Sequence, residues 1–507
     1  MKKTAILIIF LTFISKALGF FREIILSFFF GASSISDAYL IAYTIPGLIF
    51  SFIGTGVATS FIPIYSEIEK RDGNRNADRF TSNLIVVLLI ICSVFVFLMY
   101  NFSYSVVKAF AIGFDNNTLD LAVKFTKISI FGIFFSVCFH LFSSYLNLKN
   151  NFHIPILAGI PNNIVLIFFI WLSSQYSLIF LPIGIVASLV ANLILVLIFV
   201  RKSKFSFVFN FNFKDEQLKK LVYLSLPVII GVSVNQMNVL VDRTLASTLA
   251  VGGISALNYA NRLNSFIQGI FVISIATVMY PLISKMVANN NIEGLKKTLT
   301  EAITSINLFV IPITIGSLLF ASEVITFVFG RGAFDTQAIT LTSSALFFYS
   351  LGMIGFGLRE ILSRVFYSLQ NTKTPMLNAA LGMILNIVLN IVLSRYLGIG
   401  GLALATSIAA TFTTILLFIS LRKRIGPFGM KQISISFLKI LFASLVMGGL
   451  AKLSFNYLTA SLSQNLSLLL AIGVGAVSYF VIIYFMKIED VDVIVGAIKK
   501  KLGRGAA

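Results

Sequence analysis

The sequence predicts an all-α integral membrane protein with about fourteen transmembrane helices. The first observation behind this class is composition: of 507 residues, 58% are hydrophobic and 11% are charged, whereas soluble domains carry about 25% charged residues. The mean hydropathy of +0.96 agrees with it. The second observation is that apolar runs of roughly 20 residues, the length of a spanning helix, follow one another along the chain. The third is that lysine and arginine concentrate in the short loops between these runs.

The apolar runs predict the helices in order. Their centres lie near residues 18, 50, 92, 133, 163, 190, 232, 270, 309, 350, 385, 411, 445 and 474. The first run follows Met1-Lys2-Lys3, as in a signal peptide, but it is long, carries charges and lacks a small-residue cleavage site. We therefore expect it to be retained as a helix. Cys92 and Cys138 lie in apolar runs and predict buried thiols, not a disulfide framework or a metal cluster.

The positions of lysine and arginine predict the orientation. These residues fill every second loop, including residues 70–79 and 201–220, and the C-terminal tail. Short loops rich in lysine and arginine face the cytoplasm. With an even number of spans, both termini are expected on the cytoplasmic side. Because the formal net charge of +20 is spread over these loops, it does not indicate a nucleic-acid partner.

The chain also repeats itself after about 220 residues. The matching features are a glycine break before a helix, a later Pro-x-x-Ser, and an Asn with a Pro four residues on; they are Gly31 and Gly252, Pro63 and Pro281, Asn151 and Asn371, and Pro155 and Pro375. Six spans separate the repeats, so the repeats share one orientation. This predicts two six-helix lobes related by an axis along the membrane normal, with a site between them, and two additional C-terminal helices.

These observations give the expected domains. The N-lobe is predicted at 1–203, a cytoplasmic amphipathic linker at 204–220, the C-lobe at 221–425, two further helices at 432–487 and a basic cytoplasmic tail at 488–507. Within the linker, the stretch 205–213 is expected on the membrane surface.

Charges inside the spans are the functional signal. Lys16, Arg22 and Glu23 lie in the first apolar run, and Asp37 opens the second. A lone Lys or Arg at a helix centre costs roughly 2.5–3.5 kcal/mol, so such residues normally face a protein interior or a wet cavity. Lys16 precedes the other two by nearly two turns, which predicts one shared face, and Glu23 is expected to pair with its neighbours. Asp37 is either part of this site or a helix N-cap.

The second half adds Arg262, which lies well within an apolar run and is expected to line a cavity. Several unneutralised cations suit an anionic substrate such as a pyrophosphate, because charge-assisted bonds to phosphate are strong. Three further residues, Asn386, Asn390 and Thr406, could hold Na⁺ or simply bond neighbouring helices. The group Arg359, Glu360 and Arg364 either extends the cationic wall or forms a structural ion-pair cluster.

Motifs for nucleotide binding, nucleophilic hydrolysis and zinc hydrolysis are absent from the sequence, so neither an enzyme nor an ATP-driven pump is expected.

Five segments resemble the MurJ (MviN) lipid II flippases of the MOP exporter superfamily. They are residues 15–23 (SKALGFFRE), 30–39 (FGASSISDAY), 255–263 (SALNYANRL), 329–334 (FGRGAF) and 366–375 (FYSLQNTKTP). The resemblance implies a MATE-like fold of two lobes with alternating access. It also implies transport of undecaprenyl-pyrophosphate-linked disaccharide pentapeptide (lipid II) to the outer leaflet of a bacterial cytoplasmic membrane, by a monomer.

By this resemblance, Arg22, Arg262 and Asp37 match the family's cavity residues, Lys16 stands where arginine is usual and Glu23 replaces an aspartate. These five are the expected substrate-binding residues.

The resemblance also suggests an ion site and shows two departures. A sodium site would comprise Asp242, Asn386, Asn390 and Thr406, although Asn390 falls where an acidic ligand is expected. No other cofactor is expected. In the second helix, Phe50 and Thr55 replace an arginine and a glutamate that are common in the family. This difference keeps a flippase for another polyprenyl-linked glycan as an alternative; a cation-coupled drug exporter would need acidic cavity residues, and a membrane scaffold would leave the cations unexplained.

Overall fold

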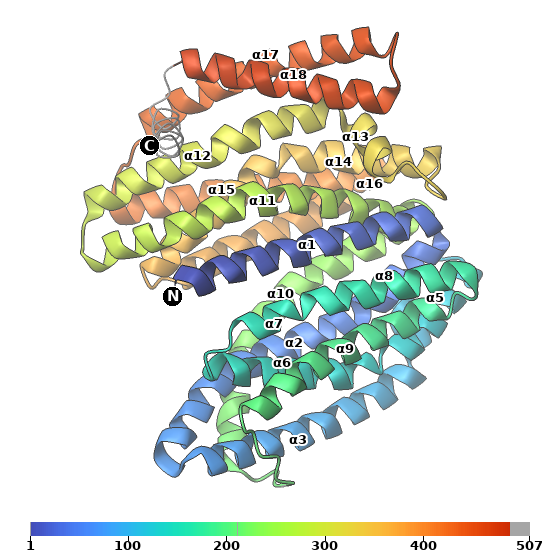
Figure 1. Ribbon diagram of the computed structural model, residues 1–507, viewed down its shortest axis with the longest axis vertical. Coiled ribbons are helices and arrows are strands. Elements are labelled where there is room, and N and C mark those ends of the chain that lie inside the picture. The colour runs from blue at the N-terminus through green and yellow to red at the C-terminus, as the bar shows by residue number, and fades with distance from the viewer. Residues whose placement is uncertain (1, 210, 487–507) are drawn as a thin grey trace, which may run out of the picture. The chain divides into compact units, whose positions relative to one another are not determined.

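Helices form the described structure, a computed structural model that covers residues 2–209 and 211–486. No strand occurs among these residues, so the predicted all-α class is confirmed. The basic tail predicted at 488–507 lies outside the described residues. Figure 1 shows the helices, which are α1 (Lys2–Phe30), α2 (Ser34–Asp72), α3 (Asn74–Asn101), α4 (Ser103–Phe110), α5 (Asn116–Ser129), α6 (Gly132–Leu148), α7 (His153–Leu157), α8 (Gly159–Gln175), α9 (Phe180–Lys202), α10 (Glu216–Leu249), α11 (Gly253–Ala288), α12 (Ile292–Leu319), α13 (Ala321–Phe329), α14 (Thr336–Leu351), α15 (Met353–Ser368), α16 (Lys373–Ile425), α17 (Met430–Leu458) and α18 (Gln464–Phe485).

The helix lengths agree with the predicted number of spans. Among the described residues, 8 helices are long and apolar enough to cross a membrane, or 10 if the bent pairs α5–α6 and α14–α15 each form one span. α16 joins two helices across Gly398, whose φ of 54° and ψ of −133° are not helical, so it provides two spans. α1, α2 and α10, with 29, 39 and 34 residues, also exceed the about 20 residues that a span needs. Length alone therefore allows the about fourteen spans expected from the apolar runs, whereas length and composition together identify 8 to 10 among the described residues.

The chain divides into two compact units. Unit 1 comprises Met1–Asn258 and Arg331–Ala338, and unit 2 comprises Tyr259–Gly330 and Ile339–Ala507. The division falls inside α11, not at the linker. α10 belongs to unit 1 because it packs along α2, where Ser225 Oγ donates a hydrogen bond of 3.0 Å to Gly56 O. The predicted N-lobe, linker, C-lobe and C-terminal helices are defined from the sequence repeat and not from compactness, and this division stays a prediction.

In unit 1, α2 packs against α5, α6 and α10, and α1 packs against α8. Small residues allow the close contact between α1 and α8. A Cβ on Gly159 of α8 would collide with Ser15 Oγ of α1, so the two helices meet closely at this glycine. The contact positions α1 for the polar cluster described below.

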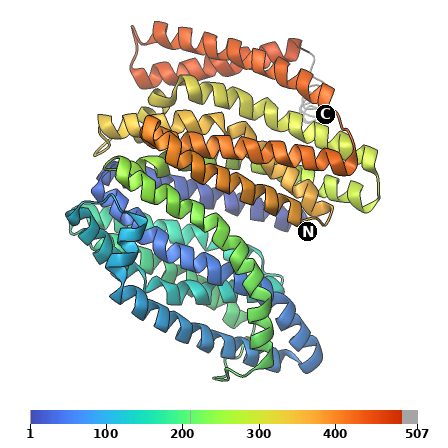
Figure 2. The ribbon, with the colours of Figure 1, turned by 180° about the vertical axis from the view of Figure 1, so that it is seen from behind.

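In unit 2, α12 packs against α15 and α17, and α17 packs against α18. Buried aliphatic side chains such as Ile303, Ile306, Leu362 and Val365 form the core of this unit. Figure 2 shows α17 and α18 side by side, in orange-red. The α17–α18 hairpin is fixed by Tyr479, whose hydroxyl donates a hydrogen bond of 2.6 Å to Leu308 O of α12.

Backbone conformations bear out the internal repeat. Gly31 before α2 and Gly252 before α11 have φ of 61° and 77°, both in the left-handed region that favours glycine. The segments around Asn151 and Asn371, which also match in the sequence, form the same kind of turn. Asn150 and Gln370 have φ of 60° and 55°, and the next residue in each turn donates its N–H to a helix carbonyl at 2.9 Å. The chain therefore folds alike at positions about 220 residues apart.

Candidate functional site

A buried ion pair lies in the apolar helix α1. Arg22 and Glu23 are 8% and 1% exposed, and Arg22 Nη2 donates to Glu23 Oε1 at 2.5 Å. The predicted pairing of Glu23 is thus confirmed. Because an isolated charge inside a span is costly, each member of this pair permits the burial of the other.

Two side chains from other helices hold the arginine. Arg22 Nη1 donates to Asn163 Oδ1 of α8 at 3.4 Å, and the guanidinium lies 5.6 Å from the centre of the Tyr43 ring of α2. Asn163 is itself fixed, since its Nδ2 donates to Gly159 O at 2.7 Å and to Ser15 O at 3.3 Å. The guanidinium therefore has a defined position before any ligand binds.

The carboxylate of Glu23 receives a second donor. Asn258 Nδ2, at the start of α11, donates to Glu23 Oε2 at 3.0 Å. Four helices thus meet at one polar group, here called the Arg22 cluster, which consists of Arg22, Glu23, Tyr43, Asn163 and Asn258. The sequence prediction missed the last three. The available signals were an Asn162-Asn163 pair inside an apolar run and an asparagine four residues before Arg262.

The remaining two predicted cations are placed differently. Lys16 is exposed on α1, whereas Arg22 and Glu23 are buried. Arg262 belongs to unit 2 and is also exposed, one helical turn after Asn258 on α11. Lys16 and Arg262 therefore carry accessible positive charge, and their binding of substrate stays a prediction.

Asp37 has a structural partner in the first turn of α11. Its carboxylate, 1% exposed, accepts hydrogen bonds of 2.7 Å from both Ser255 N and Ser255 Oγ. Asp37 lies in the first turn of α2, as predicted, but the helix whose N–H group it caps is α11. This contact joins the two glycine breaks of the repeat, and a role of Asp37 in substrate binding stays a prediction.

Replacing Asp37 with alanine is expected to lower the free energy of unfolding by about 1–2 kcal/mol, because the buried first turn of α11 loses its acceptor. Ser255→Ala is the matched control. It removes the hydroxyl donor but keeps the N–H to carboxylate bond, so its loss should be about half as large. Chemical unfolding of both purified variants measures the difference. An equal loss in the two variants would contradict capping by the carboxylate.

The predicted sodium ligands fall into different units. Asn390 Nδ2 donates to Asn386 Oδ1 at 3.0 Å, and Asn386 Nδ2 donates to Thr406 Oγ1 at 3.3 Å, so these three meet across the two halves of α16. Asp242 lies on α10 in unit 1. The bonds observed in α16 fit the interpretation in which these side chains join helices. Within residues 2–209 and 211–486, no group of three or more His, Cys, Asp or Glu side chains could hold a metal ion.

The cluster on α15 is a structural ion pair. Arg364 Nε and Nη2 donate to Glu360 Oε1 at 3.0 and 2.9 Å, and the Arg364 guanidinium lies 5.6 Å from the Tyr280 ring centre. The bonds between Arg364 and Glu360 support the interpretation of this group as a structural ion-pair cluster.

An open groove without charged side chains occurs in unit 2. Its volume is about 550 Å³, and its lining from α11, α12, α17 and α18 includes Phe271, Pro312, Met447, Gly475 and Tyr479. A groove of this composition suits a hydrocarbon chain, not a charged group.

Long apolar helices with a fixed ion pair, accessible cations and an apolar groove define a polytopic membrane transporter. The sequence model of the family described as "Lipid II flippase MurJ" matches residues 26–473. The chain therefore belongs to the lipid II flippase MurJ family.

Relatives and solved structures agree with this family. The chain is 32% identical to the probable lipid II flippase MurJ of Buchnera aphidicola subsp. Baizongia pistaciae, over 82% of each chain. It is 30% identical to the lipid II flippase MurJ of Thermosipho africanus, over 93% of each chain. A solved structure titled "Lipid II flippase MurJ, inward closed conformation" has a TM-score of 0.83 and 30% identity, covering 95% of this chain and 98% of that one. A MATE transporter of the MOP superfamily, with a TM-score of 0.70 and 15% identity over 81% of this chain and 94% of that one, shares the fold.

Proposed function

We propose that this protein moves lipid II across the membrane in which its helices lie, by alternating access. The observation that carries the proposal is the family match over residues 26–473, together with a TM-score of 0.83 to a MurJ structure. The proposed work is transport of an intact lipid, and we propose no catalytic step. We further propose that the protein acts as a monomer in a bacterial cytoplasmic membrane, without a nucleic-acid partner.

The head group and the tail of such a lipid need different surroundings. Its pyrophosphate suits the exposed cations Lys16 and Arg262, because ionised donors form the strongest bonds to phosphate. Arg22 is paired with Glu23 and would contribute a fixed, partly neutralised guanidinium. The polyprenyl tail suits the apolar groove of unit 2. In this proposal Asp37 acts by holding the first turn of α11.

The basic loops support an orientation with both termini in the cytoplasm, because loops rich in lysine and arginine favour that side. Transport toward the outer leaflet is proposed from the match to the lipid II flippase family. The membrane potential or an ion gradient would supply the energy, and Asn386, Asn390 and Thr406 with Asp242 are the candidates for Na⁺ binding. If this is correct, an ionophore that collapses the potential or the sodium gradient will stop flipping. Unchanged flipping under both treatments would exclude this energy source.

Rescue of a bacterium depleted of its own lipid II flippase tests the proposed function. The measurement is the amount of lipid II exposed on the outer leaflet, at equal membrane levels of the protein. Restored exposure supports lipid II as the substrate and shows that Phe50 and Thr55 are compatible with it. Failure to restore exposure by the folded protein would instead favour another polyprenyl-linked glycan.

Arg262→Ala is expected to reduce flipping about 10- to 100-fold, because one charge-assisted hydrogen bond is worth about 1.5–3 kcal/mol. Lys16→Ala should have an effect in the same range. Arg395→Ala is the matched control, since Arg395 is another exposed arginine of unit 2 and has no proposed contact with the substrate. Full activity of the Arg262 and Lys16 variants at normal expression would show that these cations do not bind the head group.

A further inference from the structure

The segment between α9 and α10 carries phenylalanine at every second position. We call residues 203–209 and 211–215 the strap; its aromatic residues are Phe205, Phe207, Phe209, Phe211 and Phe213. The sequence predicts an amphipathic stretch here. In the structure the strap is not a helix, and its phenylalanines are spread along an irregular segment.

Hydrogen bonds fix the strap to one side of α3. Ser206 N donates to Asp78 Oδ2 at 3.1 Å, and Val208 N donates to Ser82 Oγ at 3.2 Å. Asn212 N donates to the side chain of the next residue of α3, Asn83 Oδ1, at 2.9 Å. Backbone N–H groups in irregular segments need such acceptors, and α3 supplies a row of them at its polar start. The strap is therefore held in place by the protein.

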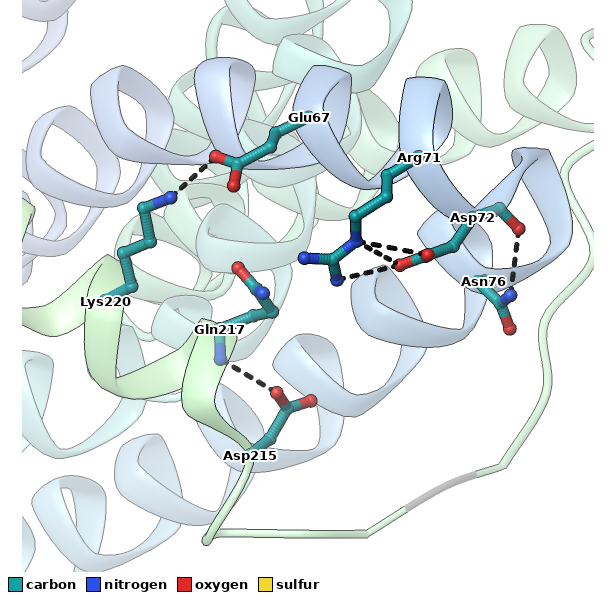
Figure 3. Close-up of polar contacts among 7 residues, drawn as sticks. All are labelled: Glu67, Arg71, Asp72, Asn76, Asp215, Gln217 and Lys220. Atoms are coloured by element: carbon teal, nitrogen blue, oxygen red, sulfur yellow. Dashed lines mark hydrogen bonds and ion pairs between the residues drawn. The ribbon is translucent and has the colours of Figure 1, made fainter.

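The end of the strap is also fixed, where α10 begins. Asp215 Oδ1 accepts the Gln217 N–H at 2.9 Å, and Lys220 Nζ lies 2.6 Å from Glu67 Oε2 of α2 (Figure 3). The hydrogen bond and charge of Lys220 lower the pKa of the Glu67 carboxyl below its usual value. This ion pair is a second contact between α10 and α2, beside the hydrogen bond of Ser225 to Gly56.

Most of the strap's aromatic surface lies open. Phe205 packs against Phe142 and Tyr145, with ring centres 5.6 and 5.2 Å away. The other four are half or more exposed: Phe207 54%, Phe209 76%, Phe211 50% and Phe213 52%. Phe211 and Phe213 lie together, with ring centres 5.0 Å apart. Exposed apolar side chains grouped in this way mark a protein or membrane contact.

The position of the strap along α3 favours the membrane. Ser82 and Asn83, which hold the strap, directly precede the apolar part of α3 that starts at Leu84. α9 likewise ends its apolar run with Arg201 and Lys202 immediately before the strap. The open phenylalanines are thus attached at the level where two spans pass from lipid to water. Phenylalanine is among the apolar residues that interfacial segments bury at this level.

Charges around the strap indicate the kind of lipid. Exposed lysine and arginine residues lie at both ends of the strap and just beyond them; they are Arg201, Lys202, Lys204, Lys214 and Lys219. The acidic residues close to the strap are largely engaged: Asp78 accepts from Ser206, Asp215 caps α10 and Glu67 pairs with Lys220. Glu216, at the start of α10, is exposed. Basic residues next to a membrane attract anionic lipid head groups by about 1 kcal/mol each.

We propose that the strap is a binding surface for anionic phospholipids, with its open phenylalanines inserted among the head groups and its flanking lysines against their phosphates. This goes beyond lipid II transport, because the surface binds the bulk lipid of one leaflet and is independent of the substrate. It would hold this end of unit 1 at a fixed depth.

A tryptophan placed in the strap tests its depth. The chain has 1 tryptophan, Trp171, so Trp171→Phe gives a background without indole emission. In that background, Phe209→Trp is reconstituted in vesicles of phosphatidylglycerol and phosphatidylcholine, part of whose lipids carry a nitroxide quencher at the top of the acyl chain. We expect blue-shifted emission and strong quenching. Arg75→Trp is the matched control, because Arg75 is exposed two turns before Ser82 on α3, and its replacement should emit as in water.

Two results would overturn the proposal. Quenching at position 209 no stronger than at position 75 would show that the strap does not enter the lipid. Equal quenching at position 209 in vesicles of phosphatidylcholine alone would exclude selection of anionic lipid. We expect the triple change Lys204→Gln, Lys214→Gln and Lys219→Gln to lower the quenching in anionic vesicles to the phosphatidylcholine value. Unchanged thermal unfolding of each variant shows that its fold is retained, and the assay works whether or not lipid II is transported.

Discussion

Replacing Arg22 with alanine is expected to destabilise the protein by about 3–5 kcal/mol and to abolish flipping. Glu23 is 1% exposed, and Arg22 is its ion-pair partner. Without the guanidinium, a carboxylate would remain inside a membrane span with Asn258 as its hydrogen-bond donor. Removing one member of a buried ion pair is costly, because the buried carboxylate loses its guanidinium partner. Thermal unfolding in detergent and flipping in vesicles measure the two effects.

The double variant Arg22→Ala with Glu23→Gln separates stability from transport. A neutral amide at position 23 keeps an oxygen for the Asn258 donor and removes the negative charge that Arg22 neutralises. We expect most of the lost stability to return while flipping stays absent. Recovery of both properties would mean that Arg22 acts only by neutralising Glu23. No recovery of stability would show instead that the Tyr43 and Asn163 contacts stabilise the cluster.

The helices and the repeat were predictable because they depend on local sequence. Apolar runs of spanning length and glycine breaks such as Gly31 and Gly252 are read directly from the chain, and both features recur in the structure. The Arg22 cluster was predictable only in part. Its ion pair joins adjacent residues, whereas Asn163 and Asn258 come from positions 141 and 235 residues away from their partners. No periodicity within one helix reveals such partners.

The face shared by Lys16, Arg22 and Glu23 shows a second limit. At about 100° per residue, Lys16 and Glu23 differ by about 20° around α1, but the rise separates them by about 10 Å. Arg22 is turned away from Lys16 by about 120°. Lys16 and Glu23 therefore point in a similar direction from α1 but are too far apart along the helix to touch. Lys16 is exposed, whereas Arg22 and Glu23 are buried. Asp37 shows the same limit, since its sequence position predicts a cap but not that α11 is the helix capped.

Gly332, in the turn at residues 329–334, lies in close backbone contact with the end of α1. Gly332 has φ of 65°, and a Cβ there would collide with Phe28 O of α1. Next to it, Ala333 N donates to Phe28 O at 2.8 Å, and a Cβ on Gly31 would collide with Ala333 O. The turn and the end of α1 thus approach each other through two glycines. This contact explains why residues 331–338 group with unit 1 although both neighbouring helices continue into unit 2.

Gly332→Ala is therefore expected to destabilise the protein by about 2–5 kcal/mol, the sum of left-handed strain and steric overlap. Gly73→Ala separates the two terms, because Gly73 has φ of 83° but nothing within 4 Å of a Cβ. Its cost should be the strain alone, about 1–3 kcal/mol, because a ψ of 168° places Gly73 in a region that other residues rarely adopt. Chemical unfolding measures both variants. A larger loss at position 332 would show that the turn helps to position α1, the helix that carries the Arg22 cluster. Equal losses would mean that the turn moves aside freely and that α1 is positioned by its contacts with the other helices, α8 above all.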